Sequence, residues 1–96
     1  MRENRFQSDL IREIKQRFPG CIVLKNDPNY LQGFPDLTIF YGPRWALLEC
    51  KKSAHERRQP NQEHYIERGN EMSFARFIYP ENRAEVLDDL QQAFQP

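Results

Sequence analysis

With 96 residues, of which 39% are hydrophobic and 12% aromatic, the chain is long enough for one folded domain over residues 1–96 and too apolar to be disordered. No apolar run reaches membrane-spanning length and no signal peptide precedes the first predicted helix, so we expect a cytoplasmic protein, in the host cell cytoplasm if a phage encodes it. The net charge is zero, yet residues 1–58 carry 11 Lys and Arg against 7 Asp and Glu, and residues 59–96 carry 3 against 7. The basic half suits an anionic polymer, though less strongly than a dedicated nucleic-acid binder would.

The first predicted element is a helix that ends at Pro19-Gly20. Glu3 and Gln7 lie four residues apart on a stripe beside its apolar face, so both can face one site. A solvated surface position is the alternative for each, and for Glu3 it is the favoured one. The apolar residues that recur at helical spacing are Phe6, Leu10, Ile11, Ile14 and Phe18.

A short β-prone run, residues 21–25, predicts the first strand, and the turn-forming residues 26–33 predict a loop. The loop leads into Asp36 and should form a rim of any site there, with Lys25 and Tyr30 as candidate substrate contacts or as ordinary surface residues. The two cysteines, Cys21 and Cys50, do not form a zinc motif with the histidines, so we interpret them as small apolar strand residues.

Residues 36–41 and 44–51 predict two strands joined by the tight turn Gly42-Pro43, which implies an antiparallel hairpin. Their nearly continuous apolar runs indicate central strands covered on both faces. Because side chains alternate along a strand, Glu49 and Lys51 should point to one face and Cys50 to the other. If Asp36 begins the neighbouring strand, two carboxylates and one ammonium converge on one spot, where they can hold a hard divalent cation beside a phosphate.

The second half of the chain completes the pattern. Residues 52–58 form a polar connector directly after the predicted cluster. Pro60 fits the first turn of a helix that ends near Gly69, residues 73–79 predict a fourth strand, and the spacing of Asn82 and Glu85 predicts the start of a last helix. The predicted order is α-β-β-β-α-β-α. The connector residues that can contact phosphate, or simply be solvated, are Lys52, His55, Arg57 and Arg58.

Pro35-Asp36, followed after a short spacer by Glu49-Cys50-Lys51, resembles the PD-(D/E)XK nuclease motif. The surrounding order is similar to the small VRR-NUC branch, which occurs alone in phages and attached to larger repair nucleases. The resemblance covers nearly the whole chain and includes the glycine at Gly33, the basic connector and a glutamine, Gln62, that opens the next helix. It implies a restriction-endonuclease-like α/β fold with three layers and a mixed central sheet.

The resemblance also implies metal-dependent hydrolysis of phosphodiester bonds. Asp36 and Glu49 would bind Mg²⁺ or Mn²⁺ with the backbone carbonyl of Cys50. Lys51 would orient or help deprotonate the attacking water, and Gln62 would position Lys51 or that water. Family members often carry a glutamate in the first helix; here Gln7 stands at that position and Glu3 one turn earlier, and either could contribute through a metal-bound water.

By analogy with stand-alone family members, the expected substrate is branched DNA such as a four-way Holliday junction, cut by a homodimer. Two alternatives remain at this point. One is a nuclease-fold DNA-binding module with weak or no catalytic activity. The other is a protein-interaction domain that uses its acidic last helix. A surface Glu–Lys pair beside a helix-capping aspartate is the structural alternative for the motif itself.

Overall fold

The structure is a computed structural model that describes residues 3–95, and the predicted element order is confirmed. None of the helices in that range is long and apolar enough to cross a membrane. The elements are α1 (Glu3–Arg17), β1 (Ile22–Lys25), β2 (Leu37–Tyr41), β3 (Arg44–Cys50), α2 (Pro60–Met72), β4 (Ala75–Ile78) and α3 (Arg83–Phe94).

The four strands form one mixed sheet in the order β1-β2-β3-β4. The first three strands run antiparallel, and β4 lies parallel to β3 after the α2 crossover. Gly42 has a φ of +60° in the two-residue turn between β2 and β3, a conformation that glycine adopts without strain. The turn fixes the hairpin register, in which Tyr41 pairs with Arg44 and Leu37 with Leu48.

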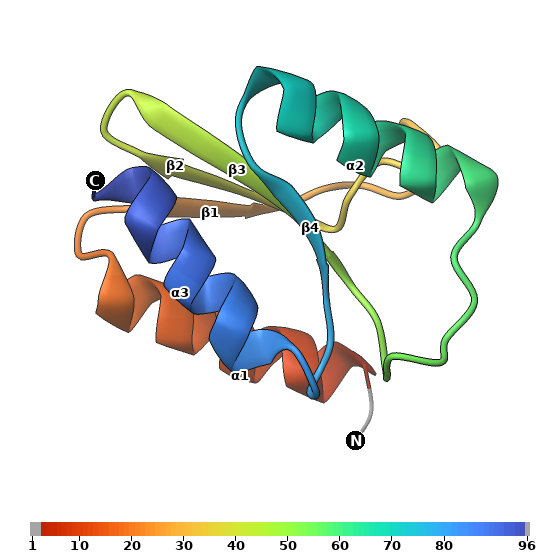
Figure 1. Ribbon diagram of the computed structural model, residues 1–96, viewed down its shortest axis with the longest axis horizontal. Coiled ribbons are helices and arrows are strands. Elements are labelled where there is room, and N and C mark those ends of the chain that lie inside the picture. Colours follow the sequence, from red (N-terminus) through yellow and green to blue (C-terminus); the bar gives the residue numbers. More distant parts are fainter. Residues whose placement is uncertain (1–2, 96) are drawn as a thin grey trace.

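Helices cover both faces of the sheet, as predicted (Figure 1). α1 and α3 lie together on one face, and their apolar sides pack with alternate strand residues such as Leu37, Ile39 and Leu48 into the main core. Cys50 belongs to this core and is fully buried. Because side chains alternate along β3, Glu49 and Lys51 point to the opposite face, where α2 lies.

α2 packs against β3 and β4 through a smaller cluster. A Cβ atom added at Gly69 would come within 2.7 Å of the Ala75 Cβ, so the helix lies close to the sheet there. The β1–β2 half of the same face is less covered. Leu24 pairs with Thr38, which pairs with Leu47 of the α2 cluster, so the three side chains share that face. The exposed apolar residues of this half are Ile22, Leu24 and Phe40, at 58%, 46% and 42%.

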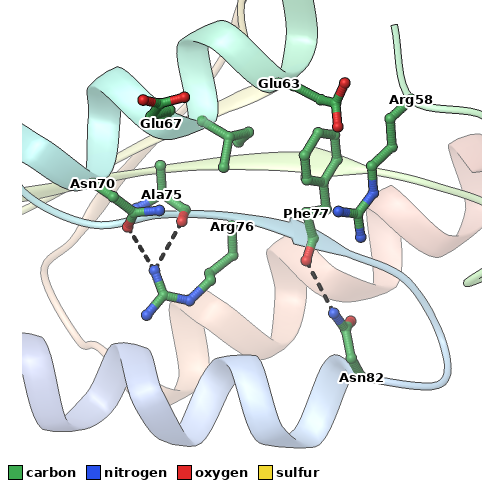
Figure 2. A pocket seen from close by; sticks show the side chains of 9 residues that line it. Arg58, Glu63, Glu67, Asn70, Ala75, Arg76, Phe77 and Asn82 are labelled. Carbon is green, nitrogen blue, oxygen red and sulfur yellow. Dashed lines mark hydrogen bonds between the residues drawn. The ribbon is translucent and has the colours of Figure 1, made fainter. Parts of the chain in front are cut away.

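The outer edge of β4 is capped by side chains (Figure 2). Asn70 Oδ1 accepts the Ala75 N–H at 2.8 Å, and the Arg76 guanidinium donates to the Ala75 carbonyl at 2.9 Å. Asn82 Nδ2 donates to the Phe77 carbonyl at 3.0 Å, and Asn82 Oδ1 accepts the Tyr79 N–H at 2.9 Å. Asn82 is the N-cap residue of α3, as its spacing predicted, but its side chain makes no capping hydrogen bond because it serves β4.

Candidate active site

The loop before β2 holds Asp36 at the start of the strand. The Asn26 N–H donates to the Asp36 carbonyl at 2.8 Å, which extends the β1–β2 ladder by one pair. The Asn26 side chain donates to the Pro35 carbonyl and to Thr38 Oγ1, both at 2.8 Å. These three bonds tie the end of the loop to the sheet and fix the backbone on either side of Asp36.

Asp36 lies opposite Glu49 because the hairpin register continues one residue beyond the pair of Leu37 with Leu48. The Asp36 N–H donates to Glu49 Oε1 at 3.1 Å, and the Cys50 N–H donates to Asp36 Oδ2 at 2.9 Å. Each carboxylate is therefore anchored by a backbone amide of the other strand. Glu49 is 5% exposed and Asp36 is half-buried, so the pair lies in a largely water-excluded place.

Gln62, in the first turn of α2, connects the carboxylates to Lys51. Its Nε2 donates to Glu49 Oε2 at 3.0 Å, and its Oε1 accepts from Lys51 Nζ at 2.7 Å and from the Gln59 N–H at 3.0 Å. Both ends of the amide are used, so its orientation is fixed. The structure thus brings together the four side chains that the sequence singled out for chemistry: Asp36, Glu49, Lys51 and Gln62.

The Lys51 ammonium has three acceptors although its side chain is only 4% exposed. Besides Gln62, it donates to the Arg57 carbonyl at 3.0 Å and to Glu56 Oε2 at 3.5 Å. Glu56 was missed by the sequence reasoning. The only signal for it was its position as the single acidic residue of the otherwise basic connector, five residues after Lys51.

The remaining predicted residues come from α1, from the segment before Asp36 and from the connector. Gln7 is half-buried near the start of α1, which packs against β3. Glu3 begins α1, and its side chain lies outside the described part of the structure. Arg58 stacks its guanidinium over the Phe77 ring at 4.1 Å beside α2 (Figure 2). The other predicted substrate contacts are exposed: Lys25 and Tyr30 before Asp36, and Lys52, His55 and Arg57 in the connector.

Burial raises the pKa of the Asp36 carboxyl above its usual range. The Cys50 N–H and the Lys51 ammonium oppose this rise, while the Glu56 carboxylate adds to it. Ionised Asp36 is therefore costly to the metal-free fold at neutral pH, and a cation would relieve that cost. This carboxylate, with Glu49 beside it, suits a hard divalent ion.

Mg²⁺ commonly takes one or two protein carboxylates and completes its shell with water and phosphate oxygens. Within residues 3–95, no three His, Cys, Asp or Glu side chains are grouped as a metal cluster. Asp36 and Glu49 are two hard oxygen donors, which fits Mg²⁺ or Mn²⁺ with an open shell.

Asp36→Asn should raise the melting temperature of the metal-free protein at pH 7. The raised pKa means that Asp36 contributes most stability when protonated, and that this contribution is lost as the pH rises through its folded-state pKa. Asparagine stays neutral and can still accept the Cys50 N–H. The gain should shrink at acidic pH, where Asp36 itself protonates. Melting curves across pH with a chelator present test this, and an unchanged or lower melting temperature at pH 7 would contradict it.

Comparison with known proteins agrees with this geometry at the level of the fold. No family model matches the chain, and no curated protein matches it. Among solved structures, a VRR_NUC domain protein matches with a TM-score of 0.72 and 17% sequence identity, over 99% of this chain and 89% of that chain. The predicted restriction-endonuclease-like fold is therefore confirmed over nearly the whole sequence.

Proposed function

We propose that this protein is a metal-dependent DNA endonuclease that hydrolyses phosphodiester bonds. The observation that carries the proposal is the connected set Asp36–Glu49–Gln62–Lys51, in which two adjacent carboxylates are joined to an ammonium through a single amide. Carboxylates can hold a divalent metal, and a nearby buried cation can stabilise the charge that develops in phosphoryl chemistry. The VRR_NUC-like fold supports the same activity.

Asp36 and Glu49 would hold Mg²⁺ or Mn²⁺, with the Cys50 carbonyl as a further oxygen donor. The bound ion would polarise the scissile phosphate and make a water more acidic. Gln62 holds the Glu49 carboxylate and the Lys51 ammonium in fixed positions relative to each other. Lys51, fixed by its three acceptors, would place positive charge where negative charge gathers on the phosphate, and would orient the attacking water.

The substrate contacts would come from the two segments that flank the cluster. Lys25 and Tyr30 lie just before Asp36, and the connector that follows Lys51 exposes Lys52, His55 and Arg57. Arg58 adds a planar cation next to the site, held over Phe77. Cations on both sides of a reactive centre suit a phosphate backbone that passes across it.

Branched DNA, such as a four-way junction, is the preferred substrate in this proposal, on the strength of the family resemblance alone. The experiment compares linear, nicked, single-stranded and four-way DNA in Mg²⁺ and in Mn²⁺, with Asp36→Ala as the control. We expect cleavage that stops with a chelator and with Asp36→Ala. Equal rates on the junction and the linear duplex would reject junction selectivity, and equal activity of Asp36→Ala would reject the site.

A homodimer would supply two sites for paired nicks. The support for it is the exposed apolar surface beside edge strand β1, formed by Ile22, Leu24 and Phe40. We propose that a second copy covers this surface. Leu24→Lys should lower the molar mass measured by light scattering from dimer to monomer. Met72→Lys is the control, because Met72 is another exposed apolar side chain, 60% exposed, at the C-terminal end of α2 and outside the set Ile22, Leu24 and Phe40. A monomeric parent protein would contradict the dimer.

An inactive DNA-binding or protein-interaction module is the alternative, and Gln7 favours it because a glutamine brings no charge to a metal. Binding of DNA in chelator without cleavage in any metal would support the binding module. If the protein neither binds nor cleaves DNA, the protein-interaction domain is the alternative that remains.

A further inference from the structure

Glu56 is the one carboxylate of the connector, and it is bound at both oxygens. Glu56 Oε1 accepts the Lys52 N–H at 2.6 Å, and Glu56 Oε2 lies 3.5 Å from Lys51 Nζ. The Glu56 N–H donates to the Ser53 carbonyl at 3.2 Å, which closes a turn within the connector. The side chain therefore folds back onto the end of β3 and contacts two consecutive residues there.

This contact completes the surroundings of Lys51. The ammonium has three hydrogens, and the structure gives it three acceptors, one each from α2, from the Arg57 backbone and from Glu56. Glu56 is the only charged one of the three. Its side chain is 29% exposed and that of Lys51 is 4% exposed, so the pair is screened less than a surface ion pair.

We propose that Glu56 is a positioning residue of the active site: its carboxylate fixes both the Lys51 ammonium and the first turn of the connector for cleavage. The inference rests on the proposed nuclease function. Glu56 acts through Lys51 and does not touch the substrate. Its anchored carboxylate aims the ammonium, and the turn that it closes holds the basic residues of the connector beside the site.

Two substitutions separate the two contacts. Glu56→Gln keeps a carbonyl oxygen for the Lys52 N–H but removes the charge that faces Lys51. Glu56→Ala removes both contacts. Glu56→Gln should lower kcat about tenfold at nearly unchanged KM and melting temperature, since an interaction that acts in the transition state changes kcat. Glu56→Ala should show the same loss in kcat and also a higher KM, because the connector is loosened.

Glu81→Gln is the matched control. Glu81 Oε2 accepts the Ala54 N–H at 3.4 Å, so this carboxylate also contacts the connector backbone, but it comes from the loop before α3. Its substitution should leave kcat unchanged. The Mg²⁺ concentration for half-maximal rate should rise only modestly in Glu56→Gln, because the Glu56 charge also acts on Asp36; a rate loss that excess Mg²⁺ restores in full would instead make Glu56 a metal ligand and overturn the proposal.

Amide hydrogen exchange of the metal-free, DNA-free protein tests the contact between the Glu56 carboxylate and the Lys52 N–H without an activity measurement. Exchange at Lys52 should be faster in Glu56→Ala than in the parent, and close to the parent rate in Glu56→Gln and Glu81→Gln. Unchanged exchange in Glu56→Ala, or parent-like kcat in Glu56→Gln, would overturn the inference. A parent protein that cleaves no DNA refutes the proposed function. The exchange rates then test only whether Glu56 holds the first turn of the connector.

Discussion

Lys51→Met is expected to cleave DNA about 10³-fold more slowly than the parent protein, because the substitution removes the single buried cation of the site. Methionine keeps the length and apolar character of the lysine stem, so the packing beside Phe77 should survive. The loss should appear mainly in kcat, as expected for a charge that acts in the transition state. Single-turnover cleavage at saturating Mg²⁺ measures it.

Lys52→Met is the control for this experiment. It removes a neighbouring cation that is exposed and lies outside the Gln62 network. Its effect should be a modest rise in KM, since an exposed phosphate contact contributes binding more than catalysis. Melting curves must show that both variants are folded. Lys51→Met cleaving at the parent rate would remove Lys51 from the mechanism.

Gly33→Ala is expected to be the most destabilising small substitution near the site, at about 2–4 kcal/mol. Gly33 has a φ of +86°, a conformation that side chains rarely adopt, and an added Cβ would lie 2.4 Å from Asn61 Cγ in the first turn of α2. The loop before Asp36 therefore approaches the helix that carries Gln62 closely. The loss should extend to cleavage, because separating the loop from α2 moves Asp36 relative to Gln62.

Gly20→Ala separates the cost of the positive φ from the cost of the close contact with Asn61. Gly20 has a nearly identical φ of +89° but nothing within 4 Å of an added Cβ, so this variant should lose only about 1 kcal/mol. Denaturant unfolding gives both values. The destabilisation of Gly33→Ala beyond that of Gly20→Ala should be partly reversed by a second substitution, Asn61→Gly, which removes the side chain that the added Cβ would meet. Equal destabilisation of the two alanine variants would show that the close approach to Asn61 is unimportant.

The carboxylate pair could be predicted because one short turn determines it. Once Gly42-Pro43 joins two strands with a two-residue loop, the register follows, and Asp36 must come opposite Glu49. Strand alternation then places Lys51 beside Glu49. Gln62 was found only through the family resemblance, since nothing in the helix pattern says how α2 is rotated about its axis.

Glu56 could not be predicted because irregular loops have no period. Its role depends on the path that the connector takes after β3, which is set by the turn at Ser53 and by contacts to residues outside the connector. Asn82 shows a related ambiguity. The same asparagine fits a helix cap and a strand-edge cap, and only the position of β4 decides that its side chain serves the strand.

The capped edge of β4 also limits how large an assembly can become. A sheet with two open edges can add copies at both ends and grow into a fibre. Within residues 3–95, Asn70, Arg76 and Asn82 occupy both polar backbone groups of Ala75, the Phe77 carbonyl and the Tyr79 N–H along the β4 edge, whereas the β1 side has exposed apolar neighbours. Two copies that met symmetrically along β1 would use up both open edges and present a closed edge at each end, so growth would stop at two.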